Sequence, residues 1–198
     1  MENFIGEFLI SKLQICDNLI ELFKESKNKK TGVISTENNL IRKDIKDSLD
    51  LSLNPYEKNM DNRFREYLFT LSDIKELYIK KFPACNRYSP WGIKSNVNIQ
   101  YYKPKGGFKT YHCERSEVNN NRHLVFMTYL NDVTDEGETE FYHQQLKIKA
   151  EKGKTLIWPV DWTYTHRGVV SNTQEKYIIT GWYDFLWMKF FYSIIFFL

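Results

Sequence analysis

Cysteine is scarce in this sequence of 198 residues, which contains only Cys16, Cys85 and Cys113. Three cysteines cannot all pair, and no two of them have the C-x-x-C spacing that zinc sites and redox centres use. The sequence therefore gives no support to a disulfide-stapled fold or a cysteine-based metal site. A reducing cytoplasm is the compartment that fits best.

Signals for export, for nucleic acid and for a membrane span are also missing. The stretch from Met1 to Gln14 lacks a basic segment followed by an apolar run and a small-residue cleavage site, so we expect no secretion. The net charge is only +3, with Lys and Arg spread along the chain, and this balance does not require a nucleic-acid partner.

The apolar C-terminal tail, residues 186–198, is shorter than the ~20 residues that a membrane-spanning helix needs. We interpret it as a final strand, a hydrophobic plug or a dimer contact, with contact to a membrane interface as the alternative. The oligomeric state stays open.

What the chain does contain points to a β-rich domain. Aromatic residues make up 16% of the sequence and crowd into its second half, which favours strands over a helical bundle. Apolar residues recur at helical spacing in residues 4–26, which predicts one or two helices, and in residues 61–82, which predicts another that Pro83 ends. The polar segment 31–56 is expected to form loops, with one short strand as an option.

From Val97 onward, short apolar or alternating runs predict strands at residues 97–102, 123–130, 154–158 and 177–183. We therefore predict an α+β, mainly β fold with three regions: an N-terminal helical elaboration (1–90), a barrel or sandwich core (91–185) and the apolar tail (186–198). The helices are expected to brace the β core.

The run Tyr111-His112-Cys113-Glu114 carries the most informative chemistry. In an extended backbone, His112 and Glu114 point to one face and Cys113 points to the other. His166, from another strand, would complete a set of two histidines and one carboxylate on one face of an octahedral metal. Three positions would stay open, which suits a keto-acid that chelates through two oxygens and dioxygen at the third.

The sequence has only four histidines, and the other two are weaker candidates. His123 opens an expected core strand, where a packed or hydrogen-bonded imidazole is common, and His143 is expected at the surface or at a pocket rim. The alternative for the main set is a buried His-Glu hydrogen bond and an unrelated third histidine, because H-x-E often occurs by chance.

Lys176 begins a β-type run that ends at Trp182, and alternation puts Lys176, Ile178, Thr180 and Trp182 on one face. A lysine that faces a barrel interior needs an anionic partner, because burial disfavours an unpaired ammonium. The distal carboxylate of 2-oxoglutarate would serve. The alternative is a lysine at a strand start that reaches solvent.

Several ordered motifs lie between Asn98 and Tyr183, and as a series they are more specific than any one alone. They are Tyr102-Lys103-Pro104, Gly106-Gly107, Tyr129-Leu130-Asn131-Asp132-Val133, Gly137-Glu138-Thr139-Glu140-Phe141, Gly153-Lys154, Trp158-Pro159, His166-Arg167-Gly168 and Lys176-Tyr177-Ile178-Ile179-Thr180-Gly181-Trp182. This region resembles the catalytic half of the prolyl 4-hydroxylase-like 2-oxoglutarate/Fe(II) oxygenases, particularly small stand-alone proteins encoded by bacterial viruses. For a viral protein, the expected compartment is the cytoplasm of the host cell.

The resemblance implies a double-stranded β-helix, a jelly-roll or cupin-like barrel, that uses Fe(II), 2-oxoglutarate and dioxygen, with ascorbate as an optional reductant. It assigns His112 and His166 to the metal, and Lys176 and Tyr102 to the co-substrate, with Trp182 as a further cofactor-binding candidate. Thr139 and Phe141 match a motif whose role is mainly structural.

Two positions depart from the related pattern. Glu114 stands where the related enzymes usually have aspartate, and its extra methylene still allows it to reach a metal if its strand lies slightly farther back. Glu136 stands where a glycine is common. Neither change removes a chemical group that the reaction needs.

The implied reaction is hydroxylation of an unactivated C–H bond, with decarboxylation of 2-oxoglutarate to succinate. A prolyl or other residue of a peptide or protein is the first expectation, and a free amino acid, nucleobase or small metabolite is the alternative. A non-catalytic jelly-roll binding module is the third. Arg167, Tyr111 and Trp162 are the candidate substrate residues, although Arg167 could instead pair with a neighbouring acid.

Overall fold

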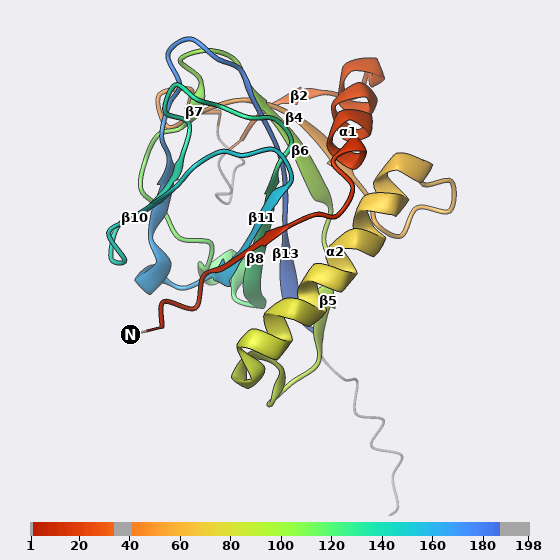
Figure 1. Cartoon of the computed structure of the whole chain (residues 1–198), viewed down its shortest axis with the longest axis vertical. Helices are drawn as coiled ribbons and strands as arrows, with labels where there is room; N and C mark the ends of the chain where they lie inside the picture. The colour runs from red at the N-terminus through yellow and green to blue at the C-terminus, as the bar shows by residue number, and fades with distance from the viewer. Residues whose placement is uncertain (1, 34–40, 187–198) are drawn as a thin grey trace, which may run out of the picture.

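The computed structural model describes residues 2–33 and 41–186, and within these ranges two α-helices pack on one side of a β barrel (Figure 1). The predicted α+β, mainly β class is confirmed. In chain order the elements, with 3₁₀ helices labelled η, are β1 (Gly6–Leu9), α1 (Gln14–Glu25), β2 (Lys30–Thr31), β3 (Lys46–Asp47), β4 (Leu49–Leu53), α2 (Asn62–Lys81), η1 (Pro83–Asn86), β5 (Trp91–Ile93), β6 (Val97–Tyr102), β7 (Gly107–Phe108), η2 (Glu117–Asn119), β8 (Arg122–Tyr129), β9 (Thr139–Phe141), β10 (Leu146–Ile148), β11 (Lys154–Pro159), η3 (Trp162–Tyr164), β12 (His166–Gly168) and β13 (Lys176–Phe185).

The barrel has a large wall and a small wall. In the described residues of the chain, the large wall is an eight-stranded antiparallel sheet in the order β1-β11-β8-β13-β6-β4-β2, with β5 also paired to β13. The small wall contains the three-stranded sheet β10-β9-β12, and β3 pairs separately with β7. An isolated bridge between His112 and His166 extends the small wall beside β12. Two facing antiparallel walls of this kind form the double-stranded β-helix.

The large wall has two different faces because successive side chains of a strand point to opposite sides. On β13, Tyr177, Ile179 and Tyr183 belong to the core under the helices. The alternate residues, Lys176, Ile178, Thr180 and Trp182, line a cavity inside the barrel. The face predicted for these four residues is therefore confirmed.

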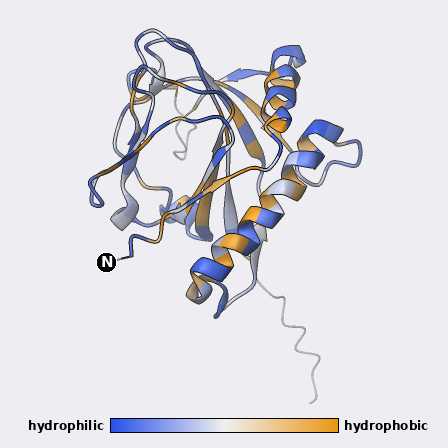
Figure 2. Ribbon diagram, in the orientation of Figure 1, coloured by the Kyte–Doolittle hydropathy of each residue, from blue (hydrophilic) through white to orange (hydrophobic). Residues whose placement is uncertain are grey.

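The outer core lies between the helices and the large wall, and Figure 2 shows hydrophobic segments along both helices. Helix α1 contributes Leu19 and Phe23, and α2 contributes Phe64 and Leu71. The inner core lies inside the barrel and includes Val125, Met127, Phe141, Trp158 and Ile178. The helices cover the outer core, and the walls of the barrel enclose the inner core.

Helix α2 confirms the helix predicted for residues 61–82. The side chain of Asp61 accepts a hydrogen bond from the Arg63 backbone N–H at 2.8 Å, which satisfies an otherwise free donor of the first turn. The helix ends at Lys81, before Pro83, whose ring cannot continue it.

Two predictions for the N-terminal region are confirmed only in part. Residues 4–26 contain α1, within the one or two helices predicted, but residues 6–9 form β1, which pairs with β11 from Gly6↔Ile157 to Leu9↔Lys154. Segment 31–56 contains three short strands, and β4 joins the large wall through pairs such as Leu51↔Ile99. In both cases, pairing with a distant strand determines the local structure more strongly than the side-chain pattern does.

The N-terminal elaboration proposed for residues 1–90 is thus joined to the barrel by strands as well as by helix packing. The tail prediction falls almost entirely on residues 187–198, which lie outside the described residues. Among the described residues, no helix is both long and apolar enough to cross a membrane.

Candidate metal centre and its cavity

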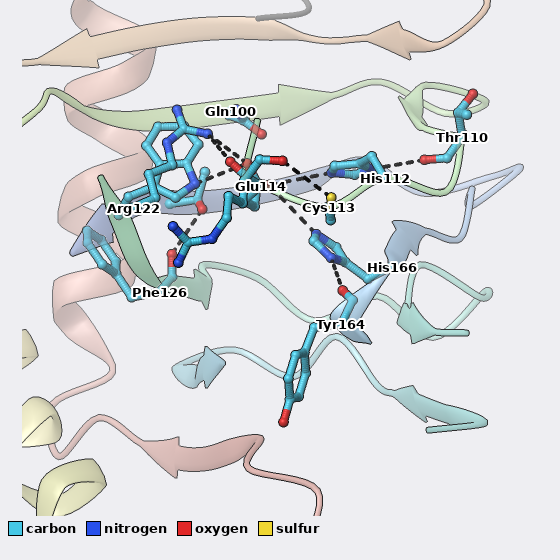
Figure 3. A network of polar contacts seen from close by, with 12 residues as sticks. Gln100, Thr110, His112, Cys113, Glu114, Arg122, Phe126, Tyr164 and His166 are labelled. Atoms are coloured by element: carbon cyan, nitrogen blue, oxygen red, sulfur yellow. Dashed lines mark hydrogen bonds and ion pairs between the residues drawn. The ribbon is translucent and has the colours of Figure 1, made fainter. Parts of the chain in front are cut away.

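His112, Glu114 and His166 point toward one another inside the barrel (Figure 3). One ligand atom from each residue lies within 4.8 Å of the other two. Glu114 Oε1 is 3.5 Å from His112 Nε2 and 3.8 Å from His166 Nε2. The sequence-predicted set therefore converges on one point.

Both imidazole rings are held in the orientation that a metal requires. The Nδ1 atom of His112 lies 2.9 Å from the carbonyl oxygen of Thr110, and that of His166 lies 2.9 Å from the carbonyl oxygen of Tyr164. A carbonyl only accepts hydrogen bonds, so each Nδ1 carries a proton, and Nε2 is the ring nitrogen available to a metal. Both Nε2 atoms face Glu114, in the arrangement of metal sites whose histidines are oriented by backbone carbonyls.

The charges of these groups also fit a divalent cation. Burial alone would raise the pKa of the Glu114 carboxyl, but the hydrogen bond from His112 and the charges of His112, His166 and Arg122 lower that pKa to about 2. Burial, followed by the charge of His112, lowers the pKa of His166 to about 4. At neutral pH the pocket thus holds an ionised carboxylate and a neutral His166 imidazole, the forms that bind metal.

The backbone around this set differs from the prediction. His112 lies in a two-residue bridge, in which His112 and His166 exchange backbone hydrogen bonds of 2.9 Å. The chain then bends, and the Glu114 and Arg115 N–H groups both donate to the carbonyl of Val160. Because the segment is not a regular strand, Cys113 also lines the cavity instead of pointing away from it.

The three residues line a cavity of ≈ 220 Å³. Phe108 stacks on the His112 ring, with 3.7 Å between ring centroids and 11° between the planes, and so covers one side of the site. Met127, Trp158 and Ile178 contribute apolar walls. A cavity that combines apolar walls with a few convergent polar groups is typical of small-molecule and cofactor sites.

Lys176 is buried in the same cavity, which confirms its predicted inward direction. Its ammonium group donates hydrogen bonds to the carbonyl oxygens of Gly137 and Val169, at 3.0 Å and 3.3 Å. Among the described residues, no acidic side chain forms an ion pair with it. Burial, opposed by the charge of Glu138, lowers the pKa of Lys176 to about 8. A buried cation without an acidic partner is suited to binding an external carboxylate.

Tyr102 lies beside this lysine, with its ring centroid 5.4 Å from Lys176 Nζ. Its hydroxyl donates a 2.6 Å hydrogen bond to Gln100 Oε1, and burial raises the pKa of the phenol well above its ordinary value. Tyr129 and Thr139 share a buried hydrogen bond of 2.5 Å and line the same cavity. The residues present therefore fit a dicarboxylate that spans from Lys176 to the metal site.

Trp182 also lines the cavity, as predicted, while the three candidate substrate residues do not line it. Arg167 forms an ion pair with Glu140 at 2.7 Å and lies over the ring of Tyr111 at 4.6 Å. Trp162 is 67% exposed. These three side chains lie outside the barrel cavity, on the outer side of the small wall.

The two remaining histidines have the roles expected of non-ligands. His123 Nε2 lies 2.9 Å from the carbonyl oxygen of Cys85, and its ring packs against Trp91. His143 is exposed and contacts Tyr142 and Trp162. Neither belongs to the converging set.

Glu136, where the resemblance predicts a glycine, has a backbone shape that glycine prefers. Its backbone φ is +59°, in the left-handed region that glycine adopts without cost, and the following Gly137 has φ +84°. The turn before β9 keeps this shape although residue 136 is glutamate. We expect a cost of about 1 kcal/mol for that residue.

Sequence reasoning missed Arg122, Gln100 and Phe108 as members of the site. Arg122 donates to the Glu114 carboxylate, Gln100 accepts from Tyr102, and Phe108 covers His112. The alternation of β6 could have identified Gln100, because Gln100 and Tyr102 are two residues apart on one strand. Nothing in the sequence alone relates Arg122 to Glu114, since an irregular segment separates them.

Comparison with protein families identifies the domain. The model of the 2OG-Fe(II) oxygenase superfamily matches residues 97–184, which include all three converging residues and Lys176. Residues 97–184 are a 2OG-Fe(II) oxygenase domain. The chain is therefore a 2-oxoglutarate-dependent dioxygenase whose cofactors are Fe(II), 2-oxoglutarate and dioxygen. No curated protein sequence matches the chain.

Solved structures show the same fold across nearly the whole chain. A viral collagen prolyl hydroxylase from Paramecium Bursaria Chlorella virus-1, in its 2OG complex, has a TM-score of 0.67 at 17% identity, over 93% of this chain and 97% of that one. A Pseudomonas putida prolyl-4-hydroxylase has a TM-score of 0.67 at 14% identity, over 92% of each chain.

A prolyl hydroxylase from Trichoplax adhaerens, in complex with a hypoxia inducible factor peptide fragment, has a TM-score of 0.72. Its identity is 16%, over 92% of this chain and 84% of that one. At these identities the likeness concerns the fold. The oxygenase thus has the prolyl hydroxylase-like barrel that the sequence resemblance implied.

Proposed function

We propose that this oxygenase hydroxylates a C–H bond of a prolyl or other residue within a peptide or protein. The observation that carries the proposal is that one cavity contains the His112, Glu114 and His166 set together with the buried cation of Lys176. The peptide substrate is supported by the prolyl hydroxylase fold and by the Trichoplax adhaerens relative, which is complexed with a peptide.

In this proposal, His112 Nε2, His166 Nε2 and Glu114 Oε1 bind Fe(II). When bound, Fe(II) would activate dioxygen, which is the oxidant: one oxygen atom would go to the substrate and the other to succinate, as 2-oxoglutarate is oxidised and loses carbon dioxide. The residues of the chain bind and orient these partners and keep water away from the reacting atoms. Three protein ligands leave positions for a chelating keto-acid and dioxygen.

Lys176 has the binding role for the distal carboxylate of 2-oxoglutarate. Its two carbonyl partners fix the ammonium group in the cavity but do not neutralise its charge. Tyr102 lies beside it and lines the same cavity. Met127, Trp158 and Ile178 form the apolar walls that exclude water from the space between Lys176 and the metal set.

Arg167, Tyr111 and Trp162 are the remaining candidates for substrate contact. Because Arg167, Tyr111 and Trp162 lie outside the cavity, any substrate contact they make would involve a segment of a peptide away from the reacting residue. A substrate with contacts on both sides of the small wall must be longer than a free amino acid. We keep these three residues as candidates for such remote contacts.

The test is mass spectrometry of peptides and metabolites incubated with the enzyme, Fe(II) and 2-oxoglutarate. We expect a gain of one oxygen on a peptide, with an equal amount of succinate formed, and no gain with His166→Ala. A gain on a small metabolite alone would replace the peptide proposal with the small-molecule alternative. Absence of both oxygen gain and succinate, with the metal bound, would contradict the hydroxylase function.

We also propose a cytoplasmic location. It is supported by Cys16, Cys85 and Cys113, all of which are free thiols. Co-fractionation of the tagged protein with a cytoplasmic marker tests this, and recovery in an exported fraction would contradict it.

A further inference from the structure

Glu114 is held by more than the two histidines that it faces. Its second carboxylate oxygen, Oε2, accepts a hydrogen bond from the Arg122 guanidinium at 3.1 Å and another from the Trp182 indole N–H at 3.1 Å. Arg122 also donates to the backbone carbonyl of Glu114 at 3.1 Å. Two side chains therefore hold Glu114 in addition to the histidines, and Figure 3 shows the contacts of Arg122 with Glu114.

The two donors hold each other in place. Arg122 begins β8 and Trp182 lies on the neighbouring β13, where the guanidinium carbon lies 3.6 Å from the centroid of the indole ring. A planar guanidinium over an aromatic face is an attractive arrangement. The side chains of Arg122 and Glu114 are only 12% and 15% exposed, so water screens their interaction weakly.

The two oxygens of the carboxylate are thus unequal. A carboxylate oxygen has about two acceptor positions, and both positions of Oε2 are used by Arg122 and Trp182. Oε1 faces His112 Nε2 and His166 Nε2. A metal at the converging point therefore meets one free oxygen of Glu114.

We propose that Arg122 and Trp182 are positioning residues that hold Glu114 so that it binds the metal through Oε1 alone. This inference rests on the proposed metal site and deepens it. It also gives Trp182 a different role from the cofactor contact predicted from the sequence, because its indole N–H is committed to Glu114.

These two hydrogen bonds, which we call the Arg122–Trp182 clamp, also explain how glutamate can act as a metal ligand at this position. Glutamate has one methylene more than aspartate, and its longer side chain has more rotamers and would reach a metal with either one or two oxygens. Fixing Oε2 removes that freedom and keeps the second oxygen from occupying a position that the keto-acid or dioxygen needs. Glu114, Arg122 and Trp182 are therefore expected to act together in metal binding.

The test compares Trp182→Phe with Trp91→Phe. Trp182→Phe keeps a ring beneath Arg122 but removes the donor to Oε2. Trp91 is the matched control: it is buried, Lys75 lies 4.7 Å from its ring centroid, and its indole nitrogen has no hydrogen-bond partner among the described residues. Only Trp182→Phe should weaken metal binding.

Metal affinity is measured by anaerobic titration with Fe(II), and with Co(II) as a spectroscopic probe, without 2-oxoglutarate or substrate. We expect Trp182→Phe to bind both ions about 10–100-fold more weakly and to change the Co(II) visible spectrum. Trp91→Phe should leave affinity and spectrum unchanged. Equal affinities for wild type and Trp182→Phe, measured on folded protein, would overturn the proposal.

A second set of variants separates a clamp from simple packing. Glu114→Asp should weaken Co(II) binding in the wild-type background, because the shorter side chain cannot reach both the donors and the metal. In the Trp182→Phe background the same change should cost less, since one donor is already lost. Strictly additive losses would mean that Trp182 acts only through packing.

Arg122→Lys provides the second measurement if Trp182→Phe fails to fold. It keeps a positive charge but loses the planar donor group, and we expect weaker Co(II) binding here as well. Unchanged binding in Arg122→Lys would contradict the clamp. Failure of the wild type to bind either ion would instead contradict the proposed metal site itself, so the two outcomes are distinguishable.

Discussion

The two faces of the large wall have the same backbone but opposite chemistry. On the helix side, the buried residues are almost all apolar, and burial raises the pKa of the Cys16 thiol to about 11, so it stays neutral. On the barrel side, Glu114 is ionised with a pKa lowered to about 2, and Lys176 is a buried cation. One face excludes charge and the other concentrates it.

This difference separates stability from function within single strands. Along β8, Leu124 and Phe126 pack under the helices, whereas Val125 and Met127 line the cavity. Burying unpaired charge opposes folding, so the polar face depends on the apolar face for its stability. Substitutions on the two faces should therefore have different consequences.

The largest expected effect is on the barrel side. His166→Ala removes one of three converging ligand atoms, and we expect it to abolish Fe(II) binding and iron-dependent succinate formation. His143→Ala, at an exposed histidine outside the set, is the control and should retain most of both. Anaerobic Fe(II) titration and a succinate assay measure the result. Equal losses in the two variants would mean that His166 is not the ligand.

A substitution on the helix side should lower stability and leave Fe(II) binding intact. Phe126 is fully buried and packs against Tyr183 with 5.0 Å between ring centroids. Phe126→Ala should lower the free energy of unfolding by about 3–5 kcal/mol, because it removes buried apolar area and leaves a cavity. Urea unfolding checks this. The folded fraction should keep its Fe(II) affinity, and a parallel loss of affinity would show that the two faces are not separable.

Lys176→Met tests the buried cation. We expect 2-oxoglutarate to bind about 30-fold more weakly or worse, because truncating one partner of a buried ion pair costs about 2–5 kcal/mol. Fe(II) affinity should stay unchanged, and the cofactor-free protein should become more stable, since a desolvated ammonium has been removed. Calorimetry with 2-oxoglutarate measures the first effect. An unchanged affinity for 2-oxoglutarate would exclude Lys176 as the partner of its carboxylate.

The same lysine predicts a pH dependence. Burial lowers the pKa of Lys176 to about 8, so in the cofactor-free protein its charge is lost as pH rises through that value. Affinity for 2-oxoglutarate should then fall by up to about tenfold per pH unit. Between this pKa and the ordinary lysine value, the unfolded chain binds more protons than the folded one, so stability of the cofactor-free protein should increase with pH.

Lys176→Arg is the control for this effect, because a guanidinium stays charged across the range. Binding of 2-oxoglutarate is measured between about pH 7 and pH 9.5 for both proteins. The fall in 2-oxoglutarate affinity with rising pH should be present in the wild type and absent in Lys176→Arg. Identical slopes would assign the pH dependence to another group.

The barrel side was more predictable from sequence than the N-terminal region. Alternation along residues 176–182 identified the inward face of β13, because a strand has a strict two-residue period. The set of His112, Glu114 and His166 followed from ligand chemistry, which needs few residue types. The extended backbone assumed between His112 and Glu114 was wrong, because the chain bends there, yet the two side chains still converge.

What the sequence could not show depends on contacts between distant segments. Phe8 and Leu9 fit a helical spacing, yet they lie on β1, which pairs with β11 almost 150 residues later in the chain. Arg122 and Trp182 meet Glu114 only because β8 and β13 are neighbours in the large wall. Side-chain patterns report local periodicity and contain no information on which strands become neighbours.

The most direct test of the account is the anaerobic visible spectrum of the Fe(II)-loaded wild-type protein as 2-oxoglutarate is added. The account predicts a weak visible absorption band that saturates with 2-oxoglutarate, requires higher concentrations in Lys176→Met and is absent in His166→Ala. Metal-loaded wild-type protein that shows no band at any 2-oxoglutarate concentration would contradict the claim that the two bind together in this cavity.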